Sequence, residues 1–263
     1  MKKNLFAILC MFSLAAITTN ANAQFSIGVK GGLSIPNLSS GGSNSNPLNS
    51  GYSSRLGPDA AVYFEYHFSN LFSLQPEIEY SSQGGKKDGL QAYPTPEQIT
   101  PLFPPGTAPA YLYANFKNET KLNYIMIPIL AKVGFDLGEN FRLYVDLGPY
   151  IGFLASAKQV TSGNSLVYAD AQGQMPLSPQ PQSFDATTDV KSSINSTNFG
   201  LEGGVGLAYV FGRNSVFIEG GGNYGFKNIQ KYSADGDNKT GAATIMVGYA
   251  MRFVKSHPTE KKK

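Results

Sequence analysis

The chain has 263 residues, including 29 glycines, 17 phenylalanines and 15 tyrosines, and it carries 21 basic and 18 acidic side chains. The first 23 residues contain Lys2 and Lys3 but no Asp or Glu, so the remainder holds 19 basic and 18 acidic residues. Because proteins that bind nucleic acids present an excess of Lys and Arg, this near-equality of positive and negative charges predicts no nucleic-acid partner.

The N-terminus has the layout of a secretory signal peptide. Lys2 and Lys3 form a positive start, residues 5–16 are apolar, and Ala-Asn-Ala at 21–23 forms a cleavage site of the A-x-A type. A transmembrane anchor is disfavoured, because about twelve apolar residues are too few to span a bilayer. The one cysteine, Cys10, lies in this segment, so we expect no disulfide, Cys-ligated metal or thiol nucleophile in the mature chain.

Eight segments after residue 23 alternate apolar and polar residues with the period of a β-strand. They are residues 25–34, 60–68, 72–82, 122–135, 141–155, 199–211, 216–226 and 243–253. The clearest is 142–154, where Leu143 and Leu147 fall on one face while Arg142 and Asp146 fall on the other. No sustained helical period follows the leader, so the sequence predicts an all-β fold.

The connections between these segments alternate in length. Three long connections (35–59, 83–121 and 156–198) and one of medium length (227–242) alternate with short turns at 69–71, 136–140 and 212–215. An antiparallel meander joined in this order has every long connection at one end. Outer-membrane barrels have an even strand count, short periplasmic turns and long extracellular loops. We therefore predict an eight-stranded antiparallel up-and-down transmembrane β-barrel, located in the outer membrane, with long extracellular loops.

A soluble barrel is the main alternative, since its strands alternate as well but with the charged face outside. Two features favour the membrane barrel. The charged face also carries small residues such as Gly148 and Gly206, which suit a crowded interior. Aromatic residues recur at the strand ends next to the turns, as at a membrane interface. These residues are Phe25, Phe68, Phe72, Phe135, Phe141, Phe211 and Phe253.

The face turned away from lipid carries most of the charged residues. Eight strands enclose a space that side chains can fill, and a buried charge needs a partner. We therefore expect an ion-pair network in the periplasmic half of the lumen, with the cations satisfying the carboxylates and Glu202 alone near the loop end. The expected members are Lys30, Glu65, Glu77, Glu79, Lys132, Arg142, Asp146, Glu219 and Arg252.

Several strands resemble a known family. Residues 120–135 (TKLNYIMIPILAKVGF) resemble a strand of the PorT-like outer-membrane β-barrel family of Gram-negative bacteria, which often reads Y-x-x-I-P-x-L-x-K. The matching positions are Tyr124, Ile127, Pro128, Leu130 and Lys132. Residues 25–35, 143–154 and 198–211 are similar to further strands of that family. The resemblance implies a porin-like or structural role, linked in some members to secretion and gliding machinery, and it supplies no catalytic motif.

No motif predicts catalysis or a cofactor. His67 and Glu65 share a face near a turn, but a hydrogen-bonded luminal histidine is a simpler interpretation than a catalytic pair. Residues 234–241 resemble part of a Ca²⁺ loop but lack the third acidic ligand and the terminal Glu, which favours an Asx-rich turn. We expect no enzyme activity, no cofactor and no metal site.

The sequence therefore divides into a signal peptide (1–23), an outer-membrane barrel domain (24–254) and a basic periplasmic tail (255–263). The fold implies outer-membrane lipid as a partner. Loop aromatics such as Tyr93 and Phe116 suit binding of a protein partner or a surface polysaccharide. The first hypothesis is thus a structural or interaction protein that acts through its loops. A narrow passive porin-like channel and an accessory component of a secretion system are the alternatives.

Overall fold

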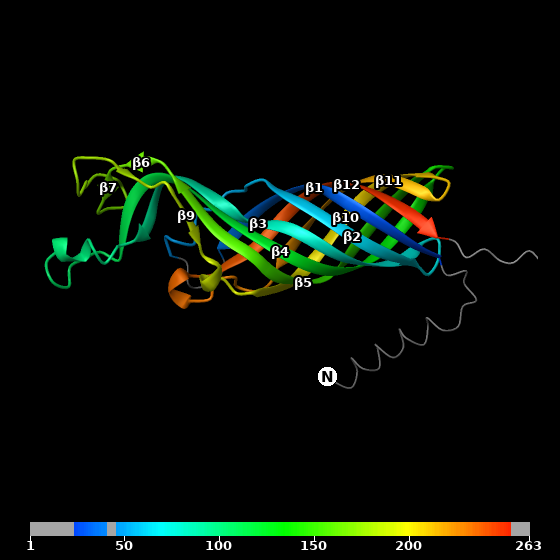
Figure 1. Cartoon of the computed structure of the whole chain (residues 1–263), viewed down its shortest axis with the longest axis horizontal. Helices are drawn as coiled ribbons and strands as arrows, with labels where there is room; N and C mark the ends of the chain where they lie inside the picture. Colours follow the sequence, from blue (N-terminus) through cyan, green and yellow to red (C-terminus); the bar gives the residue numbers. More distant parts are fainter. Residues whose placement is uncertain (1–23, 41–45, 254–263) are drawn as a thin grey trace, which may run out of the picture.

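The protein is an elongated β-barrel that continues at one end into a long hairpin and short strands (Figure 1). The structure, a computed structural model, describes residues 24–40 and 46–253. The expected signal peptide (1–23) and basic tail (255–263) lie outside these residues. Among the described residues, no helix is long and apolar enough to span a membrane.

Eight antiparallel strands form the barrel wall in chain order, and β12 pairs with β1 to close the ring. Closure pairs the backbone groups that an open sheet would leave at its edges. The strands are β1 (Gln24–Ser40), β2 (Gly57–His67), β3 (Phe72–Pro94), β4 (Tyr111–Leu137), β5 (Phe141–Ser162), β10 (Thr197–Phe211), β11 (Asn214–Gly225) and β12 (Asn238–Phe253). The predicted eight-stranded up-and-down barrel is confirmed.

Apolar side chains cover the outside of the barrel. In β2, Val62 is 52% exposed while the next residue, Tyr63, is 5% exposed. The same alternation leaves Leu147 and Val247 about 60% exposed, although both are large and apolar. Such a belt is unfavourable in water and favourable against lipid. The face that the sequence assigned to lipid is therefore the outer one.

The short connections and both ends of the described chain lie at one end of the barrel, called here the turn end. Aromatic rings gather there. Phe25 stacks on Phe253 across the closure of the ring, with 4.9 Å between ring centroids. Phe68 lies 5.5 Å from Phe72 across the first turn. Rings of this kind prefer the headgroup level of a bilayer.

β3 and β4 continue beyond the barrel as a paired hairpin (Figure 1). The prediction of a loop over 83–121 is wrong in this respect, because Gln83 to Pro94 pair in register with residues 111–122, which leaves 95–110 as the connection. A strand is predicted from sequence when apolar residues that face lipid alternate with polar ones. The hairpin lies beyond the lipid-facing belt, so its residues need not alternate and its strands were not predicted.

The connection from β5 to β10 is also partly structured, and it folds back on the barrel mouth. β7 pairs with β4, β9 pairs with β5, and β6 pairs with β8. The short elements here and elsewhere are β6 (Asn164–Ser165), β7 (Val167–Tyr168), β8 (Gln182–Ser183), β9 (Ala186–Asp189) and the 3₁₀ turns η1 (Thr100–Leu102), η2 (Lys191–Ser193) and η3 (Ser233–Asp235).

The lumen is filled by two buried apolar clusters as well as by charges. One lies in the turn half of the barrel and consists of Tyr63, Tyr144, Ala208, Phe217 and Ala250. The other lies toward the opposite end, called here the loop end, and consists of Leu38, Leu122, Tyr124, Met126, Tyr150, Leu154, Ala157, Ile194 and Ile229. The predicted ion-pair network therefore shares the turn half of the lumen with aromatic rings, which lie on the same strand faces as the charges.

Candidate functional site: luminal charges and a chamber at the loop end

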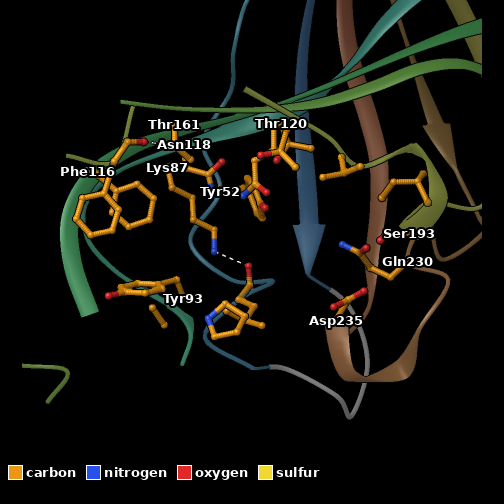
Figure 2. Close-up of a pocket in the computed structure, with 18 of the residues that line it drawn as sticks. Tyr52, Lys87, Tyr93, Phe116, Asn118, Thr120, Thr161, Ser193, Gln230 and Asp235 are labelled. Atoms are coloured by element: carbon orange, nitrogen blue, oxygen red, sulfur yellow. Dashed lines mark hydrogen bonds between the residues drawn. The ribbon is translucent and has the colours of Figure 1, made fainter. Parts of the chain in front are cut away.

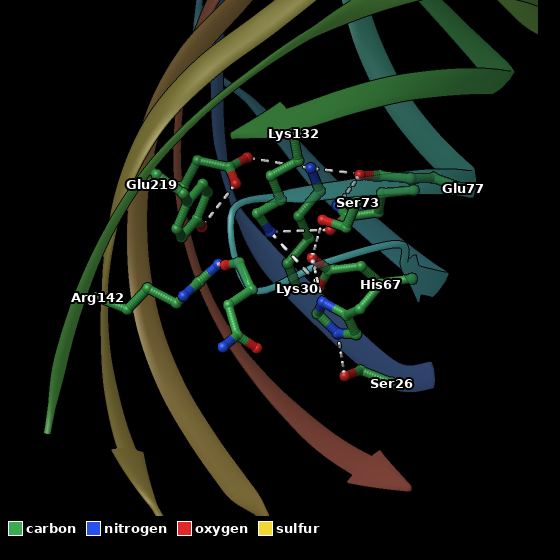
Figure 3. A network of polar contacts seen from close by, with 12 residues as sticks. Ser26, Lys30, His67, Ser73, Glu77, Lys132, Arg142 and Glu219 are labelled. Carbon is green, nitrogen blue, oxygen red and sulfur yellow. Dashed lines mark hydrogen bonds and ion pairs between the residues drawn. The ribbon is translucent and has the colours of Figure 1, made fainter. Parts of the chain in front are cut away.

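Lys30 lies among the luminal charges and crosses the barrel interior (Figure 3). Its Nζ is 3.0 Å from Oε2 of Glu77 and 3.0 Å from Oε1 of Glu219. The Tyr144 hydroxyl donates to the other Glu219 oxygen at 2.8 Å, and the Gln75 amide donates to the other Glu77 oxygen at 2.6 Å. Both carboxylates are thus paired on both oxygens, as buried charges require.

A second ammonium group, that of Lys132, lies closer to the turn end. Its Nζ donates to Oε1 of Gln75 at 2.9 Å and lies 3.8 Å from Oε2 of Glu65. The other oxygen of Glu65 accepts a hydrogen bond from Ser73 at 2.6 Å. His67 Nδ1 is 3.7 Å from the same oxygen. Two buried lysines therefore hold three of the luminal carboxylates.

The two arginines do not join this network. Arg142 pairs with Asp136 and donates to the backbone carbonyl of Asn70 in the turn-end rim. Arg252 forms no ion pair with any described residue. The expectation that both neutralise deep carboxylates needs this correction. Each lies next to a turn, so its long side chain reaches the half-open rim, where water is available.

Glu79 and Asp146 are buried where the sequence placed them, but no cation of the described residues pairs with either. Two further acids lie beside them. Asp59 was missed because it fell in a segment assigned to a loop, although it has the strand parity of Glu65 on β2. Glu202 was expected near the loop end, but strand stagger brings it to the level of Glu79.

The hairpin, β5, β9 and the neighbouring connections enclose a chamber of about 440 Å³ at the loop end (Figure 2). Its lining comes from segments far apart in the sequence, from Leu48 to Asp235. On the side facing the lumen, its lining includes Ile194 and Ile229, which belong to the apolar cluster at the loop end. A concave space of this size, with mixed walls, is typical of a small-molecule site.

Lys87 extends into the chamber from the part of β3 beyond the lipid-facing belt (Figure 2). Its ammonium donates to the carbonyls of Leu48 and Pro47 at 2.6 Å and 3.3 Å, and it lies 4.6 Å from the ring centroid of Tyr52. Burial lowers the pKa of Lys87 to about 8. The chamber therefore contains an ammonium group whose protonated fraction changes around pH 8.

Three aromatic rings form one wall of the chamber. Phe116 stacks on Phe184 with 4.8 Å between centroids and an angle of 7° between planes. Tyr93 meets Phe184 edge-on at 5.6 Å. Tyr93 and Phe116 are two of the loop aromatics that the sequence singled out, whereas Phe184 comes from a connection that carried no signal. The wall offers a flat apolar surface beside polar groups.

The rest of the lining includes amides and hydroxyls, some of which lie beside Phe116 on β4 and β5 (Figure 2). These residues are Asn118, Thr120, Gln159, Thr161, Thr188, Ser193 and Gln230. The side-chain oxygen of Asn118 is buried and accepts no hydrogen bond from any described residue. Buried polar atoms normally have partners, so this oxygen is available to accept from a bound molecule or from water in the chamber.

The sequence matches the family described as outer membrane protein beta-barrel domain over residues 19–231. No curated protein matches it. Many solved structures are similar to it, among them the following three. The attachment invasion locus protein Ail of Yersinia pestis is 15% identical over 88% of this chain and 99% of that chain, with a TM-score of 0.35. Neisserial surface protein A is 15% identical over 87% of this chain and 97% of that chain, with a TM-score of 0.36.

A major outer membrane protein from Thermus thermophilus is 11% identical over 88% of this chain and 99% of that chain, with a TM-score of 0.44. The family match spans most of the chain, and the closed eight-stranded ring with its apolar outer belt agrees with it. The protein therefore belongs to the outer membrane protein β-barrel domain family and is located in the outer membrane.

Proposed function

We propose that this protein is a non-catalytic outer-membrane barrel that binds a short segment of surface polysaccharide in the loop-end chamber. Barrels of this membrane place their long loops outside the cell, so the chamber opens to the exterior. The observation that carries the proposal is that one cavity combines an aromatic surface at Phe116 with the free acceptor of Asn118 beside it on β4.

The two kinds of lining match the two kinds of surface on a sugar ring. The ring's C–H face is apolar and packs on an aromatic ring, while its hydroxyls need amide and hydroxyl partners. The unpartnered oxygen of Asn118 would accept from one such hydroxyl. The ammonium of Lys87 favours a sugar that carries a carboxylate, such as a uronic acid.

The filled lumen supports a role in binding rather than transport. Between the chamber and the turn end lie first the apolar cluster of the loop end, which includes Leu122 and Met126, and then the ion pairs of Lys30. A solute or ion crossing the barrel would have to displace both layers. The resemblance to the PorT-like family implies a porin-like or structural role and names no ligand.

The position of the histidine supports a role without catalysis. His67 lies near the turn end, where its Nε2 is 2.9 Å from the hydroxyl of Ser26. It is therefore in the opposite half of the barrel from the chamber. No histidine lines the described chamber wall, and the side chain of its acid, Asp235, forms no hydrogen bond with a base or a nucleophile among the described residues.

Calorimetry with the mature protein in lipid nanodiscs tests the proposal, using a panel of neutral and uronic-acid disaccharides as probes. We expect binding of at least one probe. Phe116→Ala and Asn118→Ala should each weaken it about tenfold, since each removes one stacking or hydrogen-bond contact. Tyr232→Ala is the matched control, because Tyr232 is exposed at the same end but does not line the chamber. Equal affinity in all three variants, or no binding by the folded protein, would refute the proposal.

A further inference from the structure

Four buried carboxylates lie beside Lys30 without a cation of their own. They are Asp59, Glu79, Asp146 and Glu202, each at least nine-tenths buried. The ammonium of Lys30 is held by Glu77 and Glu219, and that of Lys132 reaches Glu65. In the described parts of the chain, no Lys, Arg or His nitrogen lies within 4.0 Å of the four.

Each of these four side chains also has a buried oxygen without a hydrogen-bond donor among the described residues. The atoms are Oδ1 of Asp59, Oε2 of Glu79, Oδ2 of Asp146 and Oε2 of Glu202. The other oxygen of Asp59 accepts from Ser81 at 2.9 Å. A buried carboxylate oxygen that faces neither water nor a donor is costly. Four such oxygens in one place therefore need either a bound cation or protons.

The four acids line one small cavity. Its volume is about 10 Å³, which is about the space of one water molecule or one metal ion. Lys30, Glu219, Gly203, Thr244 and Met246 complete its wall. The carboxylates of β2, β3, β5 and β10 thus converge on one point from four strands. Of the four, Glu79 and Glu202 are close enough to share one ion, and Asp59 and Asp146 lie in the wall around them.

The spacing of the carboxylates fits a large hard cation. One oxygen each of Glu77, Glu79 and Glu202 lies within 4.8 Å of the others. Ca²⁺ binds oxygen at about 2.3–2.6 Å, so oxygens on opposite sides of it are about 5 Å apart. Mg²⁺ usually keeps several of its own waters, and a cavity of about 10 Å³ has no room for them. Carboxylate oxygens are also the ligands that Ca²⁺ prefers.

We propose that this luminal cavity binds one divalent cation of the Ca²⁺ type, through carboxylate oxygens of Glu79 and Glu202, with Asp146 and Asp59 in the wall around it. The ion would join β3 to β10 at mid-barrel and offset charges that Lys30 leaves uncompensated. The site differs from the sequence expectation of no metal, because only the fold brings these residues together. It is separate from the loop-end chamber and does not depend on the sugar-binding proposal.

Metal binding to the purified, folded mature protein tests this site. We expect about one Ca²⁺ per barrel by elemental analysis, removable by a chelator. Tb³⁺ should displace it and luminesce on tyrosine excitation, since Tyr144 hydrogen-bonds to Glu219 in the cavity wall. Glu202→Gln and Glu79→Gln should each weaken Ca²⁺ binding about 10- to 100-fold. Glu97→Gln, an exposed loop carboxylate, is the matched control and should leave binding unchanged.

A folded barrel that binds no stoichiometric cation would overturn the proposal, and its carboxyl groups would then hold protons instead. So would an unchanged affinity in Glu202→Gln. If the glutamine variants do not fold, the wild-type protein still decides the question, because a ligand of the folded state raises the unfolding temperature. Ca²⁺ should raise it and a chelator should lower it, in Glu97→Gln as in wild type. An unfolding temperature indifferent to both would rule out the site.

Discussion

Tyr63 lies over the backbone of Gly28, its partner across β1 and β2, so closely that a Cβ on Gly28 would be 2.3 Å from Cζ of the ring. The arrangement recurs in two further cross-strand pairs, Tyr144 with Gly206 and Phe217 with Gly248. Each ring fills the space that a side chain on the neighbouring strand would need. Glycines therefore let an eight-stranded lumen hold three rings in its turn half.

Gly206→Ala should lower the free energy of unfolding by about 1–3 kcal/mol, as overpacking does in well-packed interiors. The new Cβ would lie 2.1 Å from Cζ of Tyr144, and that ring cannot move without losing its hydrogen bond to Glu219. Urea unfolding from lipid vesicles, followed by circular dichroism because the chain has no tryptophan, measures the change. Gly220→Ala meets open space and is the control. Equal stability of the two variants would contradict the packing described.

Lys30→Met should destabilise the barrel by about 3–5 kcal/mol, since removing one partner of a buried pair leaves an uncompensated charge. The charges left behind are those of Glu77 and Glu219. The same unfolding measurement should show that adding Glu77→Gln and Glu219→Gln restores most of the loss. Lys158→Met, on an exposed lysine, should change stability by less than about 0.5 kcal/mol. A triple variant as unstable as the single one would argue against these ion pairs.

The barrel could be predicted from the sequence because lipid imposes a rule on every residue of a spanning strand. Leu147 and Val247 must be apolar, and their neighbours turn inward, so alternation alone located all eight strands. The chamber obeys no such rule. Phe116 and Phe184 stack although they come from different connections, and neither segment shows a period. Its walls exist only once the hairpin and the β5–β10 connection have folded.

The pairing of the luminal charges was likewise beyond the sequence. Asp146 is the register partner of Lys132 across β4 and β5, which would suggest an ion pair. The ammonium of Lys132 instead turns the other way, toward Gln75 on the neighbouring strand β3 and Glu65 on β2. The position of a residue along its strand predicts which face of the sheet its side chain occupies. The neighbour that the side chain contacts depends on the stagger of the strands and on rotamers, and neither can be predicted from the alternation of apolar and polar residues.

The mature protein should give no conductance steps in a planar bilayer. The interior is filled by residues such as Met126 and Leu130, which are 2% and 1% exposed, and by the ion pairs of Lys30. A wide porin measured in the same bilayer provides the positive control. The result separates the binding role from the channel alternative. Reproducible single-channel steps from the purified wild-type barrel would show that the lumen opens and would favour the channel.

Binding of an acidic disaccharide should depend on pH through Lys87. Burial lowers the pKa of Lys87 to about 8, so the ammonium is charged below that pH and increasingly neutral above it. Affinity for a uronic-acid disaccharide should therefore fall up to about tenfold between about pH 7 and about pH 9, where about a tenth of the charge remains. A neutral disaccharide should bind equally well at both. Lys87→Met should weaken uronate binding at pH 7 and remove its pH dependence in calorimetry. If uronate affinity in this variant still falls as pH rises, a group other than Lys87 carries the charge.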